Sequence, residues 1–307
     1  MSVPYGHSFG KLLYEFLMIK VMDRKMIYGL CLFLLFVACR EEMQESHEEM
    51  VVEGWIESGG APVVLLTRTF VVELGEHVDG ETSVVLPWGK VKVSDGTDEV
   101  ILTGDYDERY FPPYIYTTSP SRMRGVPGRT YHLTVEYGDR VVTAQTTIPM
   151  PDTLEALTVT PCADVDSMYQ VTAHFDDDPA TEDYYLFLTR IFNRETRFYP
   201  SFLGVMDDSR LASQVKQVVH PGIHFFTSDD NKYRPYYHET DSVQIKFAKI
   251  DATTYRIHKA YSEMVSLSSN PIFPSDLSMP TNIEGGLGFW CGYAVTKYNV
   301  VIADSIR

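Results

Sequence analysis

The fold is decided by the stretch Gly128-Arg-Thr-Tyr-His-Leu-Thr-Val-Glu-Tyr137. Its apolar residues recur at every second position, a period that predicts a β-strand with one buried face. Gly138-Asp139 then predicts a tight turn, and residues 140–148 return as a second strand. A tyrosine, a leucine and a valine spaced in this way near the end of a β-rich unit of about one hundred residues are typical of immunoglobulin-like and fibronectin-type sandwiches.

The same alternation extends in both directions from this hairpin. The proline-rich segment 149–152 reads as a linker, because proline cannot join a central sheet ladder. The predicted fold class is therefore mostly β, with an immunoglobulin-like or fibronectin-like sandwich at 49–148 and a second β-rich domain with one or two short helices at 153–307. The helices are expected at 207–218 and 251–265, and further strands at 51–56, 62–72, 91–94, 99–103, 154–160, 169–175, 184–193, 241–250 and 289–301.

The N-terminal region is typical of a bacterial lipoprotein signal. Arg24 and Lys25 precede the apolar run 26–38, and Cys39 follows it. The run is shorter than the roughly 20 residues of a membrane span, although an ordinary transmembrane anchor is the alternative. We expect residues 1–38 to be a signal peptide with an over-extended N-terminus, Cys39 to carry lipid, and residues 39–48 to form an acidic tether.

The residues behind the cysteine predict where the protein is displayed. Arg40, Glu41 and Glu42 resemble the surface-export signal of Bacteroidetes lipoproteins. The alternative is that these acidic residues only open a solvated tether. The expected location is the outer membrane, lipid-anchored and exposed on the cell surface.

Charge and cysteine usage narrow the function classes. The net charge is −16, and removing residues 1–38, which carry +2, leaves −18. Such a surface repels phosphate backbones, so no nucleic-acid partner is expected. Cys162 and Cys291 could pair in an oxidising compartment or remain as two buried thiols.

Candidate catalytic and metal-binding patterns are weak. Asp176-Asp-Asp178 offers oxygen ligands for Ca²⁺ but lacks the spacing of a calcium loop, so a solvated turn is the alternative. His220, His224 and His238 stand outside any metalloprotease pattern. No nucleophile elbow is present. The sequence predicts no catalytic residue, no metal and no cofactor, and hence no enzyme.

Aromatic residues beside prolines are the better functional signal. Tyrosine on a stiffened loop provides large contact area at a low cost in ordering entropy. The alternative is that these rings anchor their own loops. The possible binding surface comprises Tyr110, Tyr114, Tyr116, Tyr199, Tyr236 and Tyr237.

A resemblance enters through the C-terminal motif of Asn282, Gly285, Gly286, Gly288 and Phe289. Together with Val52-Glu-Gly-Trp-Ile56 and the 149–152 linker, the motif resembles the lipoproteins catalogued as domain of unknown function 4249. The glycines are expected to be structural, since they permit positive φ or close backbone approach. The likeness covers residues 39–307.

The resemblance implies a Bacteroidetes cell-envelope lipoprotein, often encoded beside TonB-dependent outer-membrane receptors. The predicted function is a surface accessory or ligand-capture partner of such a transporter, with the receptor barrel as the partner. The alternatives are a surface adhesin or matrix-binding lipoprotein and, behind these, an envelope hydrolase.

Overall fold

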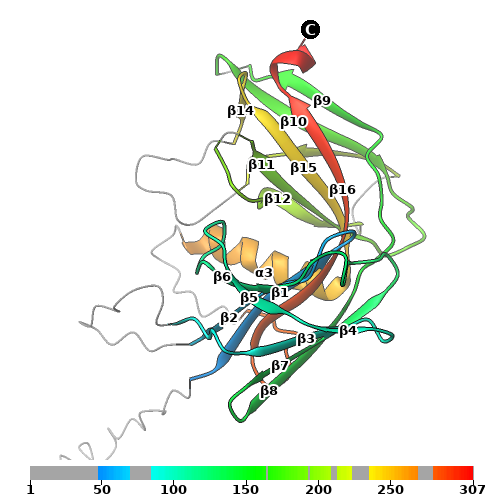
Figure 1. Cartoon of the computed structure of the whole chain (residues 1–307). Coiled ribbons are helices and arrows are strands. Elements are labelled where there is room, and N and C mark those ends of the chain that lie inside the picture. Colours follow the sequence, from blue (N-terminus) through cyan, green and yellow to red (C-terminus); the bar gives the residue numbers. More distant parts are fainter. Residues whose placement is uncertain are drawn as a thin grey trace, which may run out of the picture. The chain divides into compact units, whose positions relative to one another are not determined.

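Alternating apolar and polar residues form strands along most of the chain, which confirms the predicted mostly β class (Figure 1). The computed structural model describes residues 48–69, 84–163, 165–192, 194–208, 213–222, 235–268 and 279–306. In chain order its elements are β1 (Met50–Glu57), β2 (Val63–Arg68), β3 (Lys90–Ser94), β4 (Glu99–Ile101), β5 (Thr103–Tyr106), β6 (Tyr114–Thr117), β7 (Thr130–Tyr137), β8 (Arg140–Thr147), β9 (Ala156–Pro161), β10 (Met168–Asp176), β11 (Tyr184–Ile191), β12 (Tyr199–Asp207), β13 (Gln214–Val219), β14 (Tyr237–His238), β15 (Ser242–Ile250), the helix α3 (Ala252–Ser268), β16 (Leu287–Val301) and the 3₁₀ helix η4 (Ala303–Ile306).

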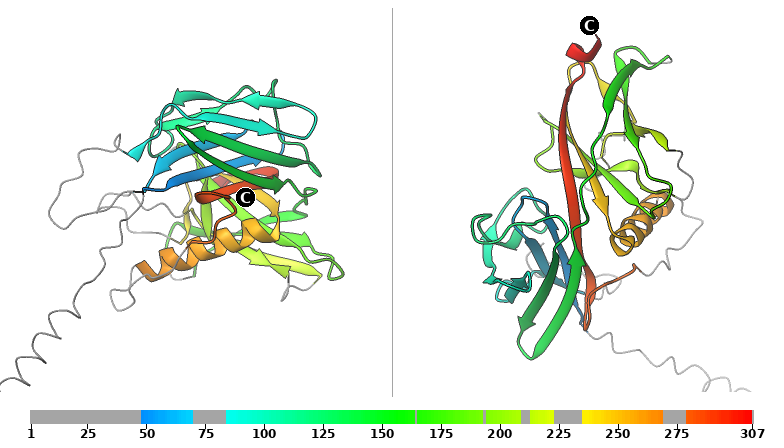
Figure 2. Two further views of the ribbon diagram at one scale, coloured as in Figure 1. Left: turned by 90° about the horizontal axis from the view of Figure 1, so that it is seen from below. Right: turned by 90° about the vertical axis from the view of Figure 1, so that its right-hand side faces the viewer.

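One large sheet runs through the described chain in the order β12-β11-β15-β16-β1-β2-β6-β5. Its central strand, β16, has different partners along its length. Residues 287–293 pair in parallel with β1, whereas residues 294–301 pair antiparallel with β15. Figure 2 shows β16 in red, with β1 (blue) beside its lower half and β15 (yellow) beside its upper half.

The first hydrophobic core lies between the part of this sheet that contains β1, β2 and β6 and a four-stranded sheet, β4-β3-β7-β8. Tyr131, Leu133 and Val135 of β7 all point into it, as the alternation predicts. Trp290 of β16 is fully buried there, and its Nε1–H donates to the backbone carbonyl of Tyr131 at 3.0 Å. The Tyr131 hydroxyl in turn donates to the carbonyl of Arg124 at 3.0 Å.

A second core lies on the same face of the large sheet, towards its other end. There β9, β10, β13 and β14 form another four-stranded sheet. Aromatic rings fill the space between the sheets. The ring of Phe247 lies 4.8 Å from that of Phe175, in a tilted arrangement, and stacks on that of Phe187 at 4.9 Å.

Helix α3 covers the opposite face of the large sheet (Figure 2). Asp251 caps its N-terminus, with the side-chain oxygen accepting the backbone N–H of Thr254 at 2.7 Å. Ile257 packs against Leu186 and Cys291 of the sheet. The helix expected at 251–265 is thus confirmed.

The second predicted helix, 207–218, is wrong where the structure describes it; residues 209–212 lie outside the described residues. β12 extends to Asp207, and β13 begins at Gln214. Val215 and Val219 pair with Phe175 and Val171 of β10, so their side chains enter the second core. The spacing of Leu211, Val215 and Val218 predicts a helix face, but Val215 and Val219 also share one face of a strand, and pairing with β10 decided between the two.

The boundary predicted at 149–152 does not divide the sheet. Residues 48–307 form one compact unit, and β16 contributes Trp290 to the first core and Val300 to the second. The segment 49–148 therefore lacks a strand that its own core requires.

Within the described part of the chain, no helix is long and apolar enough to cross a membrane.

Candidate binding site

The structure separates the six tyrosines of the predicted surface. Tyr116 and Tyr237 are buried in the two cores, so for these two the predicted surface role is wrong. Tyr116 lies on the side of β6 that faces the first core, and its hydroxyl donates to the Leu86 carbonyl at 2.6 Å. Burial raises the pKa of Tyr116 to about 12. Tyr114 is half-buried against the first core, and Tyr236 is half-buried elsewhere, before β14.

Tyr110 and Tyr199 do come together, through a residue that the sequence did not single out. The guanidinium carbon of Arg197 lies 4.9 Å from the centre of the Tyr199 ring and 6.0 Å from that of Tyr110. The ring of Tyr110 lies 5.9 Å from Trp55. Cation–aromatic attraction of this kind orders both partners. We call this group, with its neighbours Glu57, Lys246 and Phe198, the Trp55 cluster.

The alternation of side chains along β1 decides on which face of the large sheet the Trp55 cluster lies. On β1, Val52 and Ile56 point into the first core, so Trp55 and Glu57 point to the opposite face, the one that α3 partly covers. The loop that carries Tyr110 is held by Asp107, which accepts the backbone N–H of Arg109 at 3.0 Å and also its guanidinium. These bonds to Arg109 hold the pKa of the Asp107 carboxyl below its ordinary value.

Lys246 joins the cluster from β15. Its ammonium lies 2.5 Å from a carboxylate oxygen of Glu57 and 4.2 Å from the centre of the Phe198 ring, while only 9% of its side chain is exposed. Loss of solvation lowers the pKa of Lys246, and Glu57 partly offsets this. The ion pair therefore ties β1 to β15 beneath the aromatic rings.

Two guanidinium groups at the cluster form no direct ion pair among the described residues, although their charges act on the carboxyls of Glu53 and Glu195. Arg197 has no described carboxylate within ion-pair distance. Arg190 contacts the side chain of Gln244 and lies 5.3 Å from the Phe198 ring and 5.6 Å from Phe192, which is 58% exposed. Its Nε is buried without a hydrogen-bond partner. In so acidic a chain, two such cations beside aromatic faces suit a ligand with an anionic group and a flat or apolar face.

A small pocket lies between α3 and the hairpin of β11 and β12. It is lined by Leu186, Pro200, Ser201, Phe202, Val205, His258, Tyr261 and Ser262. His258 Nε2 lies 2.9 Å from the Tyr293 hydroxyl, and burial lowers the pKa of His258 to about 4. Burial also raises the pKa of the neighbouring Cys291 thiol to about 12, so this thiol is not an activated nucleophile.

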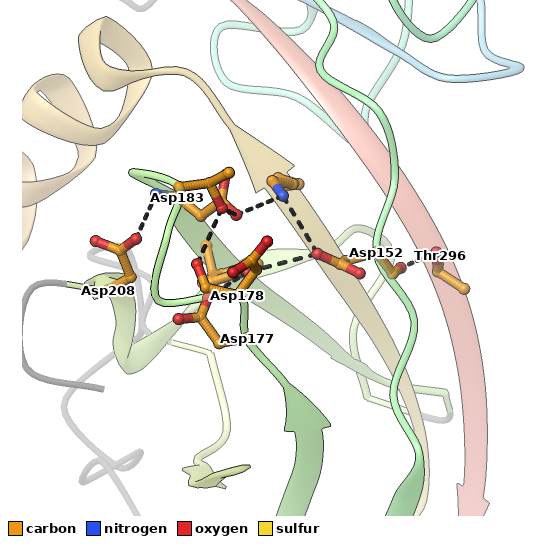
Figure 3. A network of polar contacts seen from close by, with 9 residues as sticks. Asp152, Asp177, Asp178, Asp183, Asp208 and Thr296 are labelled. Carbon is orange, nitrogen blue, oxygen red and sulfur yellow. Dashed lines mark hydrogen bonds and ion pairs between the residues drawn. The ribbon is translucent and has the colours of Figure 1, made fainter. Parts of the chain in front are cut away.

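Figure 3 shows an acidic network at the junction of the halves. The carboxylate of Asp183 lies 2.7 Å from the ammonium of Lys249, and the backbone N–H of Asp183 donates to Asp208 at 2.7 Å. From the linker, Asp152 lies 3.3 Å from the same ammonium, and its carbonyl accepts the hydroxyl of Thr296 at 2.7 Å. These contacts fasten the linker to β15 and β16.

The acidic run next to this network has structural partners. Asp177 accepts the hydroxyl of Tyr185 at 2.7 Å, and Asp178 accepts the backbone N–H of Ala180 at 3.0 Å, as in a turn (Figure 3). Burial raises the pKa of Asp177. Within the described ranges, no group of three or more acidic, histidine or cysteine side chains is placed to hold a metal ion.

The remaining sequence candidates have local partners or lie outside the described residues. The Nδ1 atoms of His220 and His238 lie 2.9 Å from the Pro235 carbonyl and the Thr240 hydroxyl. Cys162 and Cys291 are not joined by a disulfide. The candidates outside the described residues are Cys39, Arg40, Glu41, Glu42 and His224.

The glycine motif shapes the start of β16. Asn282 holds Trp290 from both sides, donating to its carbonyl at 2.8 Å and accepting its N–H at 2.9 Å. Gly288 has φ +103°, and a Cβ at this position would lie 1.9 Å from the Val52 carbonyl oxygen. Gly285 also has positive φ, Gly286 lies against the Met50 carbonyl, and the half-buried Phe289 joins the cluster beneath α3. These contacts concern backbone pairing and not a ligand.

The fold and the site define a multi-sheet β-protein with an aromatic and cationic surface cluster. The chain belongs to the family described as Domain of unknown function (DUF4249), whose model matches residues 40–299. A comparison with curated proteins finds no match.

Sequence reasoning missed Arg190, Arg197 and Lys246. Arg190 and Lys246 are cations among apolar residues of strands, and Arg197 stands in the turn before β12, between Thr196 and Phe198. The usable signal was parity on β15, because Lys246 faces away from Ile245 and Phe247, which are core residues.

Proposed function

We propose that the protein is a lipid-anchored, non-enzymatic binding protein of the outer membrane, displayed on the cell surface, that captures ligand for a TonB-dependent transporter or contacts its barrel. The lipoprotein signal ending at Cys39 and the acidic residues behind it support the location. The transporter as partner is supported by what the family resemblance implies, as is an origin among the Bacteroidetes.

The observation that carries the binding role is Arg197. Its guanidinium lies near the rings of both Tyr110 and Tyr199, and no carboxylate in the described part of the chain lies within ion-pair distance of it. The charge of Arg197 acts on the carboxyl of Glu53, whose pKa burial raises and Arg197 partly lowers. Exposed arginine and aromatic side chains dominate binding energy at many interfaces. A half-exposed surface cluster also suits a macromolecular partner better than an enclosed catalytic cleft.

For the finer fold, we propose that the β-layers around the first core are an immunoglobulin-like sandwich. Tyr131 supports this, because its hydroxyl reaches back to the backbone of Arg124 and Val126, in the manner of a tyrosine corner. The buried Trp290 packs beside it.

The first test is a mild-detergent pull-down of the tagged, lipidated protein from its native envelope, read by mass spectrometry. The wild-type chain is compared with Arg197→Ala and with Arg122→Ala, a control arginine on an exposed turn. We expect one TonB-dependent barrel at near-equal amount with the wild type and the control, and at least about tenfold less with Arg197→Ala.

Other outcomes separate the alternatives. Equal recovery with all three chains would keep the accessory role and remove the Trp55 cluster from it. No barrel, with the protein accessible to protease on intact cells, would favour a surface adhesin or matrix-binding protein. An envelope hydrolase would require turnover that depends on the pocket beneath α3, tested with Ser262→Ala.

A further inference from the structure

Large apolar side chains are exposed at one end of the first half of the molecule. The exposed fractions are 87% for Trp88, 65% for Tyr106, 57% for Val141 and 37% for Leu287. An exposed tryptophan on a soluble surface usually marks a contact with something else, because its ring has much apolar area to bury.

Strand register places these residues at the end where the chain leaves β1 towards Cys39. Leu287 pairs with Val51 at the start of β1. Val141 follows Arg140, whose guanidinium donates to the carbonyl of Glu48.

Strand pairing through β2 and β6 places Tyr106 and Trp88 at this same end, where β1 begins. Leu66 of β2 pairs with Val52, and the N–H of Leu86, just before the tryptophan, donates to the Leu66 carbonyl at 3.0 Å. Tyr106 pairs with Tyr114, whose hydroxyl donates to the Pro87 carbonyl at 3.0 Å. Figure 1 shows β1 and β3 both beginning at this end.

The turn that carries Trp88 is fixed rather than loose. The Tyr116 hydroxyl donates to the Leu86 carbonyl at 2.6 Å and accepts the N–H of Gly89 at 2.8 Å. A Cβ at Gly89 would lie 2.6 Å from the Leu66 side chain, so the turn packs closely against β2. The hydroxyl groups of Tyr114 and Tyr116 therefore fix the backbone of this turn, while the indole ring of Trp88 is exposed to solvent.

The short chain between the start of β1 and the predicted lipid anchor at Cys39 limits how far this end can lie from the membrane. Only nine peptide bonds separate Glu48 from Cys39, a reach of at most about 30 Å even when fully extended. If Cys39 carries lipid, as proposed above, the start of β1 stays close to the bilayer.

We propose that the turn 86–89, with Tyr106, Val141 and Leu287, is a membrane-contact surface that rests in the lipid interface and fixes the orientation of the protein on its anchor. Tryptophan and tyrosine favour this interface because each combines an apolar ring with a polar group. The opposite half, with Arg190 and Phe192 of the candidate binding site, is then held away from the lipid. This inference rests on the proposed lipidation.

The test uses the chain as its native host processes it, reconstituted into vesicles of phosphatidylcholine and phosphatidylglycerol, with or without brominated acyl chains. The emission of Trp88 is the difference between the wild type and Trp88→Phe. We expect brominated lipid to remove about half or more of this emission, and aqueous iodide to quench it little. A matched control, Trp88→Phe/Phe192→Trp, carries its new indole on the other half and should show the reverse.

The outcomes separate the two proposals. Flotation with the vesicles, together with iodide-accessible Trp88 and no effect of bromine, overturns the membrane contact and leaves the anchor intact. Failure to float overturns the anchor and, with it, the contact. Protection of Trp88 only when a receptor barrel is present overturns the lipid as occupant and assigns this surface to the barrel.

Discussion

Lys246 carries a positive charge on the face of β15 that turns away from the second core. Its ammonium lies between the Glu57 carboxylate and the Phe198 ring, and it is almost fully shielded from water. A buried ion pair adds little net stability, because loss of solvation offsets the attraction, yet removing one partner leaves the other charge uncompensated.

Replacing Lys246 with methionine should lower the free energy of unfolding by about 3 kcal/mol, because Glu57 then remains poorly solvated and unpaired. Denaturant unfolding measures the change. The double variant Lys246→Met/Glu57→Gln should recover most of it. A double variant as unstable as the single one would show that packing of the lysine stem, and not its charge, matters.

His258 makes stability depend on pH. Its pKa is about 4 in the folded protein, below its ordinary value of 6.5, because burial disfavours the charged ring. The unfolded chain therefore binds a proton that the folded chain does not, so stability is lost as pH falls from about 6.5 towards 4. We expect about 2 to 3 kcal/mol of this loss to vanish in His258→Gln. Equal pH profiles for the two proteins would contradict the assignment.

At the level of elements, β16 depends on backbone approach as much as on side chains. Its first half pairs in parallel with β1 only because Gly288 lets the two backbones come together. Asn282 holds the next inward residue, Trp290, through both of its backbone groups. The glycine motif thus allows the first half of β16, the strand that both cores share, to pair with β1.

Gly288→Ala should destabilise the protein severely, by more than about 3 kcal/mol, because the new Cβ meets a backbone carbonyl that cannot move aside. The matched control is Gly96→Ala, where φ is also positive, at +88°, but a Cβ meets nothing within 4 Å. That control should cost only about 1 to 2 kcal/mol. Thermal unfolding of both variants distinguishes steric clash from backbone strain, and similar losses would contradict the clash.

On the scale of the whole molecule, two cores share one strand. β16 supplies Trp290 to the first and Val300 to the second, while Lys249 and Thr296 hold the linker at Asp152. Folding of one half should therefore depend on the other.

A fragment of residues 48–152 should fail to fold by itself, since the first core then lacks Trp290 and β1 has an open edge. Near-ultraviolet circular dichroism and denaturant titration should show no cooperative transition, whereas residues 48–307 should show one. A cooperatively folding short fragment would support the predicted two-domain division.

Much of the strand pattern was predictable, because the alternation of apolar and polar side chains is visible in the local sequence, as in β7 and β15. Helix α3 was predictable from Asp251 and its apolar spacing. The failures lie where local signals conflict: β13 carries valines at a helical spacing, and β6 stands in a proline-rich stretch that reads as a loop. In both segments, pairing with a distant strand outweighed local preference.

The sequence by itself determined the mostly β class, the helix after Asp251 and the aromatic character of the candidate site. Only the tertiary structure decided that Tyr110 and Tyr199 share a site while Tyr116 and Tyr237 are core, and that β16 belongs to both halves. The physical reason is that periodicity is a property of adjacent residues. Which strands pair, and so which side chains meet, depends on burying all the apolar faces of the chain at once.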